Sequence, residues 1–271
     1  MRLRARSTRS VIESEEVWEL PRPPKLHPGY FTIDLVGPLD GSTGDGQLAR
    51  IEAAVKVNSA DRPYAVANEY VAARLAYAIG LPVPPGELVQ MRDGKPGFLC
   101  LMFKPEGKSL PPVIPSELVE QDPSFCSGVI LFDMWVRNSI DRHEGNLAYD
   151  PAVGGVIFDH DLALLGERYG RAVQDLENAI DQPCADGHCL VPEIKTADHF
   201  PMWAERIRLL PADLIRETVT KVYRLGLIKA PERDQLDRFL VFRQGRLLTY
   251  LEHCRDLFEH VNDWPLTFGG R

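Results

Sequence analysis

The stretch NSIDRHEGNLAYDPAVGGVIFDHD, residues 138–161, contains the pattern that decides the predicted fold. Asp141 is followed five positions later by Asn146, and Asp159 comes thirteen positions after that. Between them, the apolar segments LAYD and GVIFD flank the turn-forming residues PAVGG, which is typical of two short paired strands. Such a hairpin would bring Asn146, at the start of one strand, and Asp159, at the end of the other, to the same side.

These three residue types suit phosphoryl transfer. Transfer of a γ-phosphoryl group requires hard oxygen ligands for magnesium and a separate carboxylate that orients the attacking hydroxyl. Asp141 and Asn146 have the DxxxxN spacing of a kinase catalytic loop, in which the aspartate accepts the hydroxyl proton and the asparagine holds magnesium. A lone loop aspartate is more often satisfied within its own turn. The interpretation therefore depends on the three residues together.

The pattern WxxNxxDRHxGN at residues 135–146, followed by an apolar strand and FDHD, resembles the HipA-like kinases and, more distantly, the phosphatidylinositol kinases. This resemblance implies that Asp141 is the catalytic base and that Asn146 and Asp159 are metal ligands. The usual Phe-Gly after the metal-binding aspartate is replaced by His160 and Asp161. The resemblance therefore implies no switch gated by a phenylalanine.

Lys56 is the candidate for a contact with the ATP phosphates. It lies in the apolar segment IEAAVKV and precedes an "NE" pair, whose helix is expected to end at GLPVP, as in the HipA-like kinases. A buried ammonium needs an anionic partner, for which a phosphate and Glu69 are both candidates. The alternative interpretation is a surface lysine on a half-exposed strand.

Two further segments are candidates for nucleotide contacts. The Gly-rich segment GSTGDG lies between two predicted strands, and its backbone amides would be able to approach phosphates. It matches neither GxGxxG nor a Walker A motif, and Ser or Thr in such a segment usually only forms the turn. Met102 and Phe103 stand where a kinase hinge would bind adenine through backbone groups. The candidate residues of the Gly-rich segment are Gly41, Ser42, Thr43 and Gly44.

The order of the predicted elements indicates an α+β fold. Apolar periodicity and turn residues predict strands at 30–36 and 51–57, a helix at 62–79, a hairpin at 86–103, and helices from 122, at 211–226 and at 231–262. The Pro-containing segment 104–115 separates the strands from the later helices. We therefore predict a two-lobed, protein-kinase-like fold, with a small antiparallel β lobe that includes one helix and a larger, mostly α-helical lobe.

The predicted domains follow from this order. Residues 1–28 are expected to form an extended arm, because PRPPKLHP is unsuited to a helix or a central strand. Residues 29–104 would form the nucleotide-binding lobe. Residues 105–271 would carry the catalytic loop and the acceptor region.

Composition excludes some classes of function. The net charge of −8 argues against nonspecific binding of nucleic acid, and no apolar run is long enough for a membrane span. The five cysteines are scattered and odd in number, which favours reduced thiols and a cytoplasmic location. The segment CADGHC at 184–189 suggests zinc, but no second ligand pair follows at finger spacing. The sequence does not indicate an oligomeric state.

The predicted activity is the transfer of the γ-phosphate of ATP, with Mg²⁺, to a hydroxyl acceptor on a small molecule or a protein, with a protein Ser or Thr favoured. A pseudokinase that binds nucleotide or a partner without turnover is the alternative, and the intact catalytic set argues against it. A metal-dependent phosphohydrolase built on His143, Asp159, His160 and Asp161 is a third hypothesis, but acidic ligands suit magnesium better. His143 is expected to orient the loop, and His160 either to make a structural hydrogen bond or to bind metal.

Overall fold

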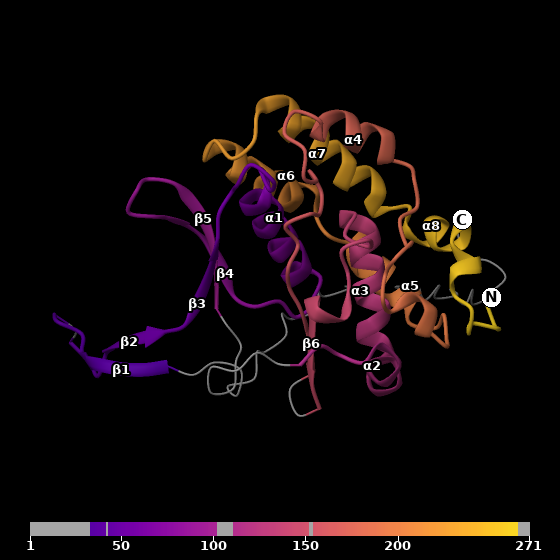
Figure 1. Ribbon diagram of the computed structural model, residues 1–271, viewed down its shortest axis with the longest axis horizontal. Coiled ribbons are helices and arrows are strands. Elements are labelled where there is room, and N and C mark those ends of the chain that lie inside the picture. The colour runs from indigo at the N-terminus through magenta and orange to yellow at the C-terminus, as the bar shows by residue number, and fades with distance from the viewer. Residues whose placement is uncertain (1–32, 42, 102–110, 152–153, 265–271) are drawn as a thin grey trace, which may run out of the picture.

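The computed structural model describes residues 33–41, 43–101, 111–151 and 154–264. Within these ranges the chain is a mixed α/β protein with three small antiparallel sheets and eight α-helices. Strands β1 to β5 lie on the left in Figure 1, and helices α3, α5 and α8 lie on the right. None of the helices in these ranges has both the length and the apolar character needed to cross a membrane. The division into two lobes, and the arm at 1–28, remain predictions.

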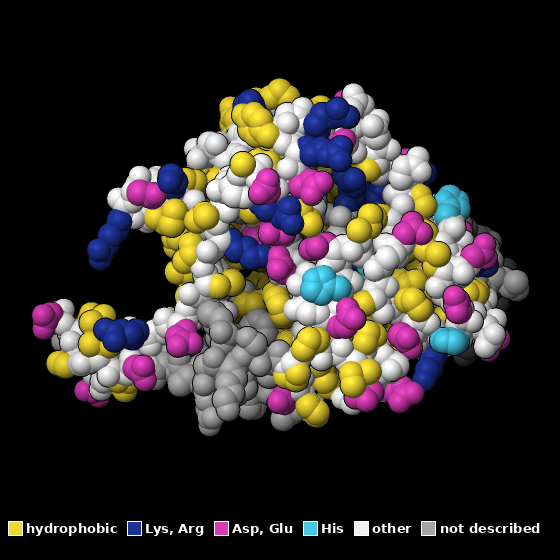
Figure 2. Space-filling view, viewed as in Figure 1, with side chains coloured by type: hydrophobic (Ala, Val, Ile, Leu, Met, Phe, Trp, Pro, Cys, Tyr) yellow, Lys and Arg dark blue, Asp and Glu magenta, His cyan; other side chains and the backbone are white. Residues whose placement is uncertain are grey.

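The first two strands form a hairpin around the Gly-rich turn. β1 (Ile33–Pro38) pairs antiparallel with β2 (Gln47–Ile51), and the predicted start of this first strand lies outside the described residues. The hairpin projects from the molecule in Figures 1 and 2. Its exposed large apolar side chains are Leu35, Val36, Leu39, Leu48 and Ile51.

The predicted single strand at 51–57 is wrong in one respect, because the structure divides it between two sheets. Ile51 ends β2, whereas β3 (Ala53–Lys56) pairs with β5 (Pro96–Leu101). The chain leaves one sheet and enters the next at Glu52, so no partner strand is continuous across that point. An apolar pattern has the same period on either side of such a break, and therefore does not reveal it.

The predicted hairpin after the first helix is confirmed for the described residues. β4 (Gly86–Gln90) pairs antiparallel with β5, and the three-stranded sheet has the order β3–β5–β4. Gly94 in the connecting turn has φ of +83°, a left-handed conformation that glycine adopts without strain. The pairing places Lys56 opposite Phe98 on the central strand.

Helix α1 (Ala65–Ala78) packs against this sheet and against α6 (Ala212–Arg224). Its alanines allow close packing, and most of its residues are buried. The helix ends just before Gly80, whose φ is +84°. The predicted helix at 62–79 is therefore confirmed, with its start three residues later.

Helix α3 (Pro123–Val136) lies in the core and leads into the loop at residues 138–146. Asp122 caps its start by accepting a hydrogen bond from the Phe125 amide at 2.9 Å, next to a proline in the first turn. The helix ends at Val136, and the capping residue Arg137 has φ of +60°. A short helix, α2 (Pro115–Gln121), precedes it and was not predicted.

The hairpin predicted after the loop at residues 138–146 is also confirmed. A 3-10 helix (Glu144–Asn146) leads into β6 (Leu147–Asp150), which pairs antiparallel with β7 (Gly154–Ile157). The register places Leu147 opposite Ile157. The hairpin therefore places the residues just before β6 near those just after β7.

The remaining chain is helical. The predicted helix at 231–262 is wrong as a single element, because it breaks at Gly245 and Arg246 into separate helices. Glycine is a poor helix former, and the break lets the following helix pack against its neighbours in the core. The elements are α4 (Ala172–Ala179), a 3-10 helix (Val191–Glu193), α5 (Phe200–Arg208), α6, α7 (Ala230–Gln244), α8 (Leu247–His253) and a 3-10 helix (Arg255–Leu257).

Close packing of α3 on α5 gives a stability prediction for Gly128→Ala. A Cβ at Gly128 would lie 2.5 Å from Cε2 of Trp203, whose indole is held by a 2.7 Å hydrogen bond to the carbonyl of Ser124. We expect Gly128→Ala to lower the free energy of unfolding by about 1–3 kcal/mol, measured by denaturant unfolding. Gly245→Ala is the control, because a Cβ there meets nothing within 4 Å. An unchanged unfolding midpoint for Gly128→Ala would contradict this packing.

Candidate active site

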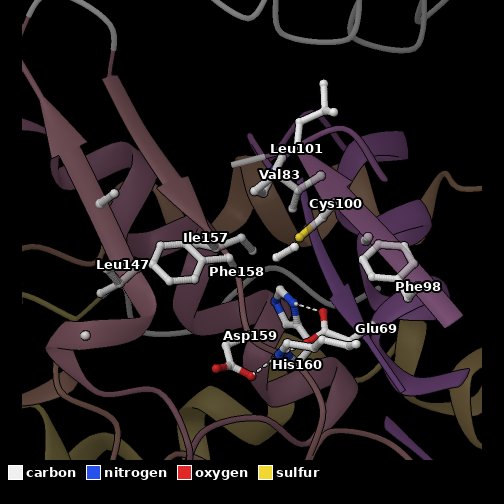
Figure 3. A pocket seen from close by; sticks show the side chains of 16 residues that line it. Glu69, Val83, Phe98, Cys100, Leu101, Leu147, Ile157, Phe158, Asp159 and His160 are labelled. Carbon is white, nitrogen blue, oxygen red and sulfur yellow. Dashed lines mark hydrogen bonds and ion pairs between the residues drawn. The ribbon is translucent and has the colours of Figure 1, made fainter. Parts of the chain in front are cut away.

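A cavity of about 300 Å³ lies between the three-stranded sheet and the β6–β7 hairpin. Figure 3 shows apolar side chains from both sides facing it and a polar group at one end. Its apolar lining includes Ala54, Val83, Phe98, Leu101, Leu147 and Ile157. Its polar end is formed by Lys56, Glu69, Asp159 and His160. A mostly apolar pocket with a few convergent polar groups is the usual form of a small-molecule site.

Lys56 links the sheet to two acidic residues at the polar end. Its ammonium forms ion pairs with the carboxylates of Glu69 on α1 and of Asp159 after β7. Burial acts to lower the pKa of Lys56, but the two carboxylates outweigh it and raise that pKa above its ordinary value. Burial acts to raise the pKa of Glu69, but hydrogen bonding with His160 and the charge of Lys56 lower that pKa to about 2. Lys56 and Glu69 are therefore both charged near neutral pH.

Two neighbouring residues of α1 hold the segment that follows β7. Glu69 accepts a hydrogen bond from the backbone amide of His160 at 2.9 Å. Asn68 donates to the carbonyl of Asp161 at 2.8 Å and accepts from the amide of Leu165 at 3.2 Å. Both α1 side chains are buried. The structure thus gives Asn68 a role in fixing this segment that we did not assign from the sequence.

Asp159 has φ of +62°, which is uncommon for a residue with a side chain. The surrounding contacts hold this conformation, because the residues on either side of Asp159 are tied down. The carbonyl of Phe158 accepts a hydrogen bond from Arg142 at 2.9 Å, and the amide of His160 is bound by Glu69. Residues kept in sparsely populated conformations by their surroundings cluster at functional sites.

The loop at residues 138–146 brings Asp141 and Asn146 together. The side-chain amide nitrogen of Asn146, Nδ2, donates a hydrogen bond to the backbone carbonyl of Asp141 at 3.0 Å. The same nitrogen lies 3.5 Å from the carboxylate Oδ2 of Asp141. His143 is exposed, and its Nδ1 accepts a hydrogen bond from the amide of Gly145 at 3.0 Å. The imidazole of His143 thus caps the 3-10 helix that ends at Asn146.

Asp141, Asp159 and Asp161 form a half-buried carboxylate cluster, in which one oxygen of each lies within 4.8 Å of the others. Burial, followed by the charges of neighbouring carboxylates, raises the pKa of both Asp141 and Asp161. Hard oxygen donors of this kind fit Mg²⁺, whose charge would offset their mutual repulsion. The sequence-based metal set was Asn146 and Asp159. The structure adds Asp161 as a candidate ligand, which the repeated acid of FDHD could have indicated.

The structure does not place the Gly-rich turn at the cavity. Gly41, Thr43 and Gly44 lie in the projecting β1–β2 hairpin and are not among the residues that line the cavity. Ser42, Met102 and Phe103 lie outside the described residues. Their proposed nucleotide contacts remain predictions.

Comparison with family models and with curated proteins finds no match. A proinflammatory kinase from Helicobacter pylori, CtkA, has a similar structure, with a TM-score of 0.54 and 15% identity over 84% of this chain and 97% of that one. HipA, from a Shewanella oneidensis MR-1 complex with HipB and operator DNA, matches with a TM-score of 0.39 and 13% identity over 90% of this chain and 69% of that one. At these identities the first likeness shows that the chain has a kinase-like fold.

Proposed function

We propose that the protein is an ATP- and Mg²⁺-dependent phosphotransferase of the HipA-like kind, which passes the γ-phosphate to a hydroxyl group, with a protein Ser or Thr as the favoured acceptor. One observation carries this proposal. Lys56 pairs with both Glu69 and Asp159 at the polar end of an apolar cavity, beside the carboxylate of Asp141. A lysine between a helix glutamate and a metal-binding aspartate is the arrangement that protein kinases use around ATP.

The cavity suggests how ATP would bind. Adenine fits the apolar part, because its faces need apolar contacts, and the phosphates would then point towards Lys56. We expect the backbone at Met102 and Phe103 to contact the adenine edge. We expect residues 41–44 to approach the phosphates, which requires the β1–β2 hairpin to lie nearer the cavity than it does in Figure 1. On this proposal residues 29–104 bind the nucleotide.

The acidic residues would divide two tasks between them. Asn146 and Asp159 would hold Mg²⁺, with Asp161 in the same oxygen cluster, and the bound ion would neutralise charge on the phosphate oxygens. Asp141 would align the acceptor hydroxyl and take its proton, which its raised pKa favours. Residues 105–271 would supply the acceptor surface, and the unpaired cysteines suit a cytoplasmic protein.

The phosphohydrolase hypothesis gains no support from this geometry. His160 is buried, and its Nε2 lies 3.0 Å from the guanidinium of Arg142. A guanidinium only donates hydrogen bonds, so that nitrogen is already used as an acceptor. His143 caps its own loop. These two imidazoles are therefore committed to structural hydrogen bonds.

Incubation of the purified protein with γ-labelled ATP tests the proposal. We expect label on the protein, or on acceptors in a heat-treated lysate, when Mg²⁺ is present, and no label when the metal is chelated. ATP binding should be measured on the same sample by calorimetry. Binding without any transferred label would reject the kinase and favour the pseudokinase, whereas release of free phosphate alone would favour a hydrolase.

A further inference from the structure

A network of three fully buried polar side chains lies beneath the catalytic loop. It consists of Asp133 on α3, Arg142 next to the catalytic aspartate, and His188 in the segment before α5, each 2% exposed or less. Buried charges are costly unless they are paired and hydrogen-bonded. The network therefore has to be nearly complete for the fold to tolerate it.

Arg142 uses each of the five N–H groups of its guanidinium. Its Nε donates to Oδ2 of Asp133 at 2.7 Å, and its Nη2 donates to Oδ1 at 3.1 Å, which is a bidentate pair. Nη2 also donates to Nε2 of His160 at 3.0 Å. Nη1 donates to the carbonyls of Asn146 at 2.6 Å and Phe158 at 2.9 Å. One side chain thus binds three separate segments of the chain.

These acceptors lie beside the proposed catalytic residues. Arg142 directly follows Asp141, Asn146 is itself a proposed metal ligand, and Phe158 and His160 flank Asp159. The hydrogen bonds therefore fix the backbone of the base and of both proposed metal ligands relative to one guanidinium. Lysine has three donors on a single atom and would not reproduce this fork.

Asp133 anchors the guanidinium to the core helix and also binds His188. Nε2 of His188 lies 3.2 Å from Oδ2 of Asp133, and its Nδ1 accepts the amide of Leu190 at 3.1 Å. Because Nδ1 is an acceptor, Nε2 carries the proton and donates to the carboxylate. Burial acts to raise the pKa of Asp133, but Arg142 and His188 lower it. Burial lowers the pKa of His188, which keeps it neutral and the network balanced.

The segment 184–190 supports the same loop through its backbone. The hydroxyl of Ser139 donates to the carbonyl of Cys184 at 2.5 Å, and the amide of Cys189 donates to the carbonyl of Arg142 at 3.0 Å. With both nitrogens of His188 in hydrogen bonds, CADGHC is arranged as a support for the loop. This is a use for the segment that its zinc-like spacing does not suggest.

We infer that Asp133, Arg142 and His188 are positioning residues, which set the separation between the base Asp141 and the metal-binding residues by holding their backbones to α3 and to the segment 184–190. Their effect on turnover rests on the proposed function, whereas the geometry of the network is independent of it. A displacement of about 1 Å at a catalytic group can lower a rate by about two orders of magnitude.

Substitution of His188 separates positioning from bulk packing. His188→Leu fills the space without a donor, whereas the side-chain amide of His188→Gln can still donate to Asp133. We expect His188→Leu to lower kcat by about 10- to 100-fold and to weaken the Mg²⁺-dependent part of ATP binding, as for other side chains that orient ligands indirectly. We expect His188→Gln to recover most of kcat. Both are to be compared with the wild type by thermal unfolding.

Arg142→Lys is the second variant, in case His188→Leu does not fold. It keeps the charge beside Asp133 and should lower kcat in a folded protein. A wild-type kcat in folded His188→Leu or Arg142→Lys, or a failure of His188→Gln to recover activity, would overturn the inference.

If the wild type transfers no phosphate, the proposed function is refuted, and the positioning role needs a different measurement. The readout then becomes the Mg²⁺-dependent affinity for a non-hydrolysable ATP analogue, measured by calorimetry. We expect it to be weaker in folded His188→Leu than in His188→Gln, because Asn146 and Asp159 lose their alignment. Equal affinities in the two variants would overturn the positioning role.

Discussion

Asp141→Asn is expected to remove phosphate transfer while ATP remains bound. The substitution keeps the size of the side chain and removes the carboxylate that would accept the hydroxyl proton, an effect worth about 10²- to 10⁴-fold in rate. Asn146 binds the backbone carbonyl of residue 141 at 3.0 Å, so the loop keeps this hydrogen bond in the variant. The measurements are the initial rate of labelled transfer and the dissociation constant of ATP, with and without Mg²⁺.

The control for this substitution is Asp213→Asn, which makes the same chemical change at an exposed carboxylate on α6. It should leave both quantities unchanged. Transfer at the wild-type rate by Asp141→Asn would show that another group takes the proton. Loss of ATP binding in Asp141→Asn would instead mean that Asp141 helps to hold the metal–nucleotide complex.

The elements predicted correctly are those whose boundaries are encoded by a few consecutive residues. Asp122 and Pro123 begin α3 with a cap and a proline, Gly80 follows α1, and Gly94 makes the β4–β5 turn. Each acts through its own backbone or its nearest neighbours. Signals of this kind are present in the sequence before any tertiary contact forms.

The errors concern the choice of partner over long distances. The break at Glu52 separates two strands with the same apolar pattern, and only the pairing of Ala53–Lys56 with β5 distinguishes them. The break at Gly245 depends on how α8 packs in the core. Neither choice is made by the residues at the break alone.

The contrast between signals from neighbouring residues and long-range partners also applies to the candidate site. Asp141, Asn146 and Asp159 could be proposed as site residues because their spacing lies within one stretch, and the structure brings Asp141 close to both of the others. Asp133 could not, because its partners lie 9 and 55 residues away. Its signal was nevertheless present, since a single carboxylate in the apolar helix FCSGVILFDMWV needs a buried partner.

The site also shows why the Lys56–Glu69 pair is expected to persist without nucleotide. Glu69 binds both the ammonium and the backbone amide of His160, and its neighbour Asn68 binds Asp161 and Leu165. Movement of α1 away from the segment after β7 would break the buried hydrogen bonds to His160, Asp161 and Leu165 together. A buried donor or acceptor left without a partner costs about 1–3 kcal/mol. The helix is therefore fixed to the segment that carries Asp159.

Asp159→Asn is expected to remove the Mg²⁺ dependence of ATP binding as well as the transfer. Asparagine tolerates the left-handed conformation at φ of +62° better than alanine does, so the variant should change the charge without changing the backbone. A metal ion contributes several kcal/mol of charge stabilisation, so transfer should fall by at least about 100-fold. The measurement is a titration of Mg²⁺ at fixed ATP analogue, followed by the transfer rate.

Asp93→Asn, in the exposed β4–β5 turn, is the matched control for Asp159→Asn and should behave as the wild type. Comparison with Asp161→Asn then tests the assignment within the carboxylate cluster. If Asp159 is the metal ligand, its variant loses Mg²⁺ affinity more severely than Asp161→Asn does. A larger loss in Asp161→Asn would place the ion nearer that second carboxylate, and would leave Asp159 chiefly as the partner of Lys56.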